Sequence, residues 1–184
     1  TLVLLDGLPL NDPINPSRSY DLAHLSLNQV ERVEILRGPQ SPLYGADAMG
    51  GVINIITRKG QGPLRLVFTG SAGNYGTVGG DVGLSGSAGR VDYSLGLSGL
   101  STAGISAASD RYPGNTEKDG YRNFSLSGRF GYAIRRNLDL DIMVRTVSDR
   151  TEIDNFGGPG GDDPNSVQHY ASTLARALVR GLFP

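Results

Sequence analysis

Cysteine is absent from the 184 residues. Its absence excludes disulfide bonds and thiolate metal sites, and it leaves the redox compartment undetermined. The chain also lacks any run of about 18 apolar residues, so we expect no transmembrane helix. That lack does not exclude a membrane protein, because a strand of a β-barrel needs only about 10 alternating residues and leaves a weak hydropathy signal.

The features of common active sites and of nucleic-acid interfaces are scarce as well. The formal net charge is −1, and no cluster of Lys and Arg is interleaved with aromatic residues, so nucleic acid is not an expected partner. The two histidines, His24 and His169, each lack a second histidine at ligand spacing, which argues against a zinc or non-haem iron site. No nucleophile elbow, P-loop or dinucleotide fingerprint occurs. We therefore expect no enzymatic activity.

The first sixty residues predict a small mixed α/β unit. Residues 2–5 form a short apolar run that the turn pair Asp6-Gly7 ends. Residues 32–36 alternate in a way that is typical of a strand with one charged face. A proline at its start favours a short helix over 42–48. The β-branched, almost wholly apolar run at 52–57 is consistent with a strand that is buried on both faces.

Beyond residue 60 the apolar residues recur with a period of two. Five successive segments each have one apolar face and one polar face that includes charges, which predicts five strands. The apolar members are Leu64, Leu66 and Phe68; Val78, Val82 and Leu84; Val91, Tyr93, Leu95 and Leu97; Phe124, Leu126, Phe130 and Tyr132; and Leu138, Leu140, Ile142 and Val144. Residues 169–183 are ambiguous, because their leucines lie at helical spacing while the topology favours a sixth strand.

The connections between these segments alternate in length. Tight turns are predicted at 87–89 and 134–136, and long polar connections at 102–119 and 149–168. Short turns at one end and long loops at the other are typical of an outer-membrane barrel. A soluble β-sandwich would show the same alternation of faces. Aromatic residues on the apolar face and glycines within the strands favour the barrel.

Three stretches resemble the plug domain of TonB-dependent outer-membrane receptors. They are Leu2-Val3-Leu4-Leu5-Asp6-Gly7, then Arg32-Val33-Glu34-Ile35-Leu36-Arg37-Gly38-Pro39, and finally Leu43-Tyr44-Gly45 with Gly50-Gly51-Val52-Ile53-Asn54-Ile55-Ile56-Thr57. The resemblance implies that residues 1–60 are the C-terminal part of a plug and that residues 61–184 are the first five to six strands of an antiparallel transmembrane β-barrel. Both ends look cut, so we interpret the chain as a fragment.

The resemblance also implies a function. Receptors of this family import scarce, bulky nutrients across the outer membrane of Gram-negative bacteria, and they are driven by TonB through an N-terminal box that this chain does not contain. The spacing of Asp21-Leu22 and Gln29-Val30-Glu31-Arg32-Val33 resembles the vitamin B12 (cobalamin) receptors. A receptor for ferric siderophores is the alternative within the family. A soluble β-rich binding or adhesion module is the alternative from a different class.

Two groups of candidate site residues follow from the resemblance. It implies that the loop over 11–21 is the plug apex facing the external binding cavity, with substrate-binding candidates Asn11, Asp12, Asn15, Arg18 and Tyr20. It also implies that the segment over 32–37 faces the barrel wall. Arg32, Glu34 and Arg37 are then expected to anchor the plug through ion pairs that can be exchanged for water.

A third group is a hypothetical metal site. Asp149, Asp154, Asp162 and Asp163 gather in the second long connection beside a glycine-rich stretch, and oxygen ligands on a flexible loop suit Ca²⁺. The spacing is not that of an EF-hand. The cobalamin receptors use aspartates of external loops for calcium, so the resemblance supports the hypothesis. We expect no other cofactor, and outer-membrane lipid as the surrounding medium.

Overall fold

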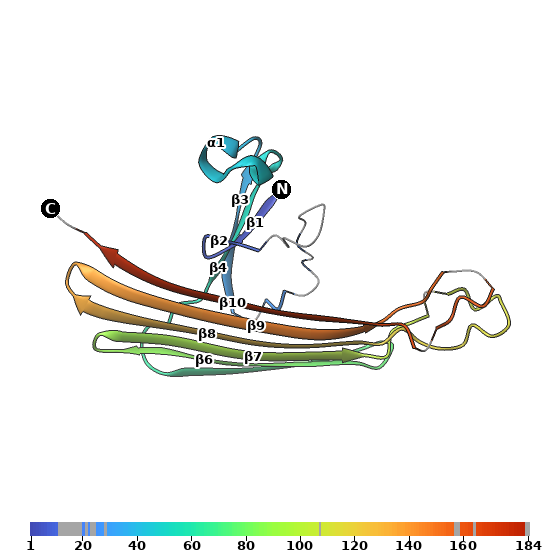
Figure 1. The fold of residues 1–184 in the computed structure, drawn as a ribbon. Coiled ribbons are helices and arrows are strands. Elements are labelled where there is room, and N and C mark those ends of the chain that lie inside the picture. The colour runs from blue at the N-terminus through green and yellow to red at the C-terminus, as the bar shows by residue number, and fades with distance from the viewer. Residues whose placement is uncertain are drawn as a thin grey trace. The chain divides into compact units, whose positions relative to one another are not determined.

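The computed structural model describes residues 1–10, 20, 22, 25–27, 29–106, 108–156, 159–163 and 165–182. The chain divides into two units, Thr1–Arg58 and Lys59–Pro184, each built on its own β-sheet (Figure 1). No helix in the described ranges is both long enough and apolar enough to cross a membrane.

The first unit contains a four-stranded sheet in the order β2-β1-β4-β3. The strands are β1 (Leu2–Leu5), β2 (Leu8–Pro9), β3 (Val30–Arg37) and β4 (Gly51–Thr57). Strands β1 and β4 are parallel, with Leu2 opposite Val52, while β2 and β3 are antiparallel to their neighbours. Strand β4 therefore lies between β1 and β3, and all its residues are buried or half-buried, as its near-continuous apolar run predicted.

The hydrophobic core of this unit is built mainly from strands β1 and β4. All four residues of β1 are buried, and Leu2, Leu4, Ala48 and Val52 form one hydrophobic cluster. Burying a leucine or valine side chain contributes roughly 1.5–3 kcal/mol. The predicted helix over 42–48 is interrupted, because Gly45 has φ 85° and separates α1 (Ser41–Tyr44) from a short 3₁₀ turn, η2 (Ala46–Ala48).

The start of β4 requires glycine. Gly51 has φ +122°, a conformation that other residues rarely adopt, and a Cβ atom built on it would lie 2.5 Å from the carbonyl oxygen of Leu36 in β3. Gly51 therefore allows β4 to approach β3 closely as the two strands begin to pair.

The second unit is one six-stranded antiparallel sheet in which each strand pairs with the next along the chain. Its strands are β5 (Arg65–Gly73), β6 (Thr77–Ala88), β7 (Val91–Thr102), β8 (Tyr121–Arg135), β9 (Leu138–Glu152) and β10 (Val167–Gly181). The ambiguous last segment is a strand, and the alternative of a helix is wrong, because 15 residues of β10 pair in register with β9.

Most connections between the strands alternate in length as predicted, but they begin and end at other residues than predicted. Residues 89–90 and 136–137 are tight turns at one end of the sheet, while 103–120 and 153–166 are long connections at the other end, where 74–76 is also a tight turn (Figure 1). The predicted turn at 134–136 begins too early, because β8 continues to Arg135 after a β-bulge between Ala133 and Arg135. The second long connection starts at 153 rather than 149 because β9 extends to Glu152.

The two faces of this sheet differ in burial in the opposite sense to those of a soluble protein. The face with most of the apolar side chains is exposed, and the face with the charged side chains is buried. On β8 the apolar Phe124 is 52% exposed, whereas its neighbour Ser125 is 2% exposed and Arg129 is 8% exposed. Strand β9 repeats the pattern, with Val144 exposed and Arg145 buried. We call the face that bears Ser125, Arg129 and Arg145 the polar face, and the opposite one the apolar face. A soluble sandwich would bury the apolar face instead.

Candidate functional site

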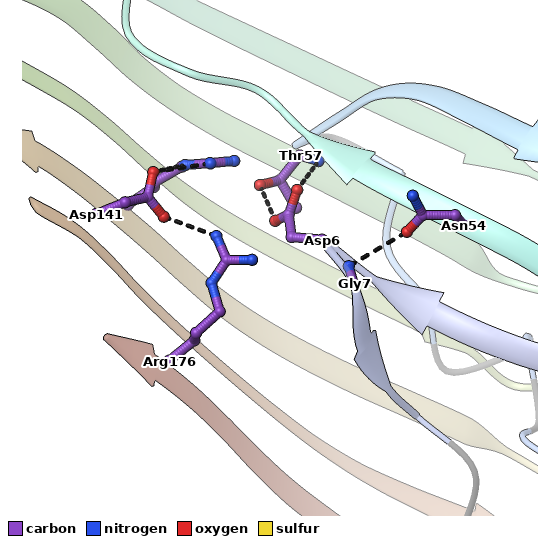
Figure 2. Close-up of polar contacts among 7 residues, drawn as sticks. Asp6, Gly7, Asn54, Thr57, Asp141 and Arg176 are labelled. Carbon is purple, nitrogen blue, oxygen red and sulfur yellow. Dashed lines mark hydrogen bonds and ion pairs between the residues drawn. The ribbon is translucent and has the colours of Figure 1, made fainter. Parts of the chain in front are cut away.

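A tight turn with a buried hydrogen-bond partner ends β1. Asp6 (φ 49°) and Gly7 (φ 84°) both have positive φ, as a two-residue hairpin turn of type I′ requires. The carboxylate of Asp6 accepts hydrogen bonds from the backbone N–H of Thr57, at 3.0 Å, and from its hydroxyl, at 2.5 Å (Figure 2). The turn after β1 is thereby fixed to the last residue of β4.

Asn54 extends these contacts across β4. Its Oδ1 accepts from the backbone N–H of Gly7 at 3.3 Å (Figure 2), and its Nδ2 donates to Glu34 Oε2 at 3.3 Å. Glu34 Oε1 in turn accepts from Arg32 Nε at 2.9 Å. A continuous polar path therefore runs from the β1–β2 turn to the exposed strand β3.

The three predicted anchors lie on β3 with different partners. Arg32 pairs with Glu34 and, at 3.0 Å, with Glu31. The hydrogen bond with Glu34 raises the pKa of Arg32. These side chains are about half exposed, so solvent screening leaves the pairs little net energy. For Arg37, the described part of the chain shows no ion pair. Their role as plug anchors stays a prediction.

The predicted apex loop falls largely outside the described residues. Asn11, Asp12, Asn15 and Arg18 all lie there, and only Tyr20 is described, as a half-buried side chain. The substrate-binding role of these five residues therefore stays a prediction.

The polar face of the second unit carries a buried ion network. Asp141 on β9 accepts from Arg129 on β8 through Nε at 3.0 Å and Nη2 at 2.8 Å. Its other oxygen accepts from Arg176 Nη2 on β10 at 2.7 Å (Figure 2). The three side chains are only 6–14% exposed. One carboxylate thus links three neighbouring strands, and its removal would leave two buried guanidinium groups without their shared anion.

Carboxylates connect the two long connections. Asp154 Oδ2 accepts from the backbone N–H of Ala108 at 2.5 Å and from Ser106 Oγ at 3.3 Å. Asp162 accepts from Ser106 Oγ at 3.3 Å and from the backbone N–H groups of Thr116 and Glu117. The acidic residues of 153–166 therefore fix the fold of 103–120 through main-chain hydrogen bonds.

The predicted calcium ligands are only partly brought together. Asp149 was expected in the loop, but it lies within β9 and is buried, because the strand runs four residues further than predicted. Asp163 accepts from Asn155 Nδ2 and the N–H of Asn165, in its own connection. The prediction that Asp149 lies in the loop with the other three aspartates is therefore wrong. Asp162 and Asp163 have ordinary hydrogen-bond partners.

The structure instead brings Asp154 together with two residues from the other long connection. Carboxylate oxygens of Glu117, Asp119 and Asp154 lie within 4.8 Å of one another. Burial raises the pKa of Glu117, and the neighbouring carboxylates of Asp162, Asp154 and Asp119 raise it further. Calcium binding stays a prediction, and these three residues are now its best ligands.

Sequence reasoning missed three groups, one of which is the pair Glu117 and Asp119 beside Asp154. Asp6, Asn54 and Thr57 were seen only as parts of a turn and an apolar strand. The network around Asp141 was only partly predictable, because the alternation places Arg129 and Asp141 on the polar faces of their segments, while Arg176 lies in the segment with leucines at helical spacing.

Comparison with known proteins agrees with this architecture. Residues 1–52 match the family model of the TonB-dependent Receptor Plug Domain. The chain is 27% identical over 175 residues to the Vitamin B12 transporter BtuB of Photobacterium profundum, a match that covers 93% of this chain and 28% of that protein. The chain thus spans little more than a quarter of the length of this curated relative.

Solved structures show the same fold. The ferripyoverdine receptor of the outer membrane of Pseudomonas aeruginosa superimposes with a TM-score of 0.71 at 16% identity, over 99% of this chain and 25% of the receptor. The siderophore receptor PirA from Pseudomonas aeruginosa gives a TM-score of 0.59 at 27% identity, over 82% of this chain and 26% of that receptor. An α/β plug unit followed by strands of an incomplete barrel, and not a two-sheet sandwich, is therefore the fold.

Proposed function

We propose that this chain is a member of the TonB-dependent receptor family and is part of an active transporter in the outer membrane of a Gram-negative bacterium. The observation that carries the proposal is the direct succession of two parts in one chain. The first matches the plug domain, and the second is a meander whose exposed face is apolar and whose buried face is charged.

The inverted faces support a position in a bilayer. A barrel wall in lipid needs an apolar outer surface and tolerates charges only toward an aqueous lumen. Arg129, Asp141 and Arg176 meet that condition because their charges lie on the polar face and are paired with one another. A lumen of this kind is where a plug is useful, since a wide pore without one would leak.

The substrate we propose is cobalamin. Support comes from the likeness to a protein named as a vitamin B12 transporter, and from the resemblance of the segment over 21–33 to that group. A ferric siderophore is the second candidate, because the chain is as similar in sequence to a siderophore receptor, at 27% identity. Substrate would bind from the long-connection side, and TonB would act on the plug through residues that precede those in this chain.

In this function the chain helps to bind the substrate and to gate the pore, and we propose no covalent chemistry for it. The half-exposed ion pairs of Arg32 would let the plug surface exchange partners at small cost, because solvent screens such pairs and leaves them little net energy. The main-chain hydrogen bonds and the Asp6–Thr57 contact would keep the plug sheet folded while it moves.

Uptake in cells tests this proposal. The full-length gene would be deleted, and the accumulation of radiolabelled cobalamin and of a radiolabelled ferric siderophore would be compared with that of the parent strain, each with and without TonB. We expect the deletion to abolish TonB-dependent cobalamin uptake and to leave siderophore uptake intact. The reverse pattern would select the siderophore, and unchanged uptake of both, or a soluble full-length protein, would refute the proposal.

A further inference from the structure

A row of basic residues crosses the apolar face near the long connections. The register places Ser101 of β7 opposite Arg122 of β8, Arg122 opposite Arg150 of β9, and Arg150 opposite His169 of β10. Side chains that lie directly opposite one another in an antiparallel sheet point to the same face. Arg122 and Phe124 are two residues apart on β8, so Arg122 shares the face of Phe124.

Arg122 and Arg150 lie directly opposite each other and destabilise the sheet unless an anion binds between them. Like charges directly across a pair of strands are destabilising. Arg150 donates to Glu152 Oε1 at 2.5 Å, and Glu152 Oε2 also accepts from the N–H of Gly120 at 3.0 Å. In the described part of the chain no side-chain hydrogen bond or ion pair engages the guanidinium group of Arg122, which is exposed. Glu152 is therefore hydrogen-bonded to one of the two guanidinium groups and acts on the other only through its charge.

The row borders a cleft with an excess of positive charge. A cavity of about 360 Å³ is lined by Arg122, Arg150 and Glu152, and by Lys118 from the first long connection. Glu152 is the one carboxylate among the described residues that line it, so three cations and one anion leave a net charge of +2. The cleft therefore suits a polyvalent anion such as a phosphate group.

The distance along β8 places this row at a membrane boundary. Tyr132 and Arg122 lie ten residues apart on the apolar face, with Phe124, Leu126 and Phe130 between them. Ten residues span about 33 Å along a strand, or about 25 Å along the membrane normal at a tilt of about 40°, which is the height of the apolar band of a barrel. With Tyr132 at one interface, Arg122 and Arg150 reach the other.

We propose that Arg122, Arg150 and Lys118 bind the phosphate groups of anionic lipid head groups in the leaflet on the side of the long connections. The inference rests on the proposed function in one respect, that the sheet crosses a membrane. Guanidinium groups bind phosphate through paired, charge-assisted hydrogen bonds, and a phosphate seated between Arg122 and Arg150 would remove their repulsion.

Lipid binding by the full-length receptor in detergent tests the inference. The probes are bisphosphorylated lipid A, the same lipid after dephosphorylation, and inorganic phosphate, with retention measured by native mass spectrometry. Replacing both arginines, R122Q with R150Q, should weaken binding of the bisphosphorylated lipid about 30-fold, as expected for two basic residues at a membrane surface. The matched control is R135Q with R136Q, which removes two arginines at the other end of β8 and should change binding less than about 3-fold.

Stability provides a second readout. Without anionic lipid, R122Q with R150Q should unfold at a higher urea concentration than the parent receptor, because the repulsion across β8 and β9 is gone. With bisphosphorylated lipid that order should reverse. Equal lipid affinity of the double variant and the parent, equal binding of the dephosphorylated lipid, or equally tight binding of inorganic phosphate would each overturn the inference. If the receptor fails to insert into bilayers at all, it is the proposed function that fails.

Discussion

Replacing Asp141 by asparagine should strongly destabilise the second unit. Asp141 accepts three hydrogen bonds from two arginines, at 2.7–3.0 Å, and all three side chains are largely buried. Asparagine keeps the shape but removes the negative charge, and its amide group would direct donors at an arginine. Removing one partner of a buried ion network costs roughly 3–5 kcal/mol. We expect the lower end, about 3 kcal/mol, because the asparagine oxygen still accepts one hydrogen bond.

The measurement is urea unfolding of the full-length receptor in lipid vesicles, followed by its heat-modifiable mobility on gels. The matched control is D139N, which removes an exposed carboxylate two residues earlier on β9 and should change the free energy of unfolding by less than about 0.5 kcal/mol. Adding R176Q to D141N should recover part of the loss, because it removes one of the two buried cations that lose the Asp141 carboxylate. A midpoint for D141N equal to that of D139N would refute the network as a source of stability.

Three further predictions concern the plug unit and the long connections. Gly51→Ala should destabilise the plug by about 2 kcal/mol or more, because the residue has a positive φ and its new Cβ atom would clash with β3. The control Gly70→Ala should be tolerated, because there is open space around Gly70. Thermal unfolding measures both variants, and equal melting temperatures would contradict the geometry. Arg37→Glu should raise the conductance of the receptor in planar bilayers by loosening the plug, and unchanged conductance together with unchanged uptake would count against an anchoring role. Calorimetry should detect Ca²⁺ binding that Asp154→Asn abolishes, and no heat with the parent receptor would remove the metal site.

The calcium prediction has a pH dependence whose sign follows from Glu117. Its pKa is raised, so the stability that its protonated form gives the long connections is present at low pH and is lost as pH rises through the raised value. A proton and a cation compete for this carboxylate. Calcium affinity should therefore fall on acidification through that pKa, and calorimetry at several pH values should show it. Affinity that stays constant would place the ion elsewhere.

The local pattern predicted most of the architecture. A period of two is a property of each strand by itself, so Phe124, Ser125 and Leu126 already indicated which side chains share a face. Turn residues such as Asp6 and Gly7 act within two positions and were equally readable. Strand ends were less certain, because β-bulges and pairing with a neighbour extended β8 and β9 beyond their apolar residues.

The sequence by itself determined the kind of protein, through the plug-like segments and the alternation of faces, because these depend on residues close together in the chain. Only the tertiary structure decided the register between strands, which sets Arg176 beside Asp141 and Arg122 opposite Arg150. It also decided which acidic residues of the two long connections meet, with Glu117 beside Asp154. Register is fixed by a whole ladder of hydrogen bonds and paired side chains, so shifting one strand by a single residue would turn its members of these strand pairs to the other face.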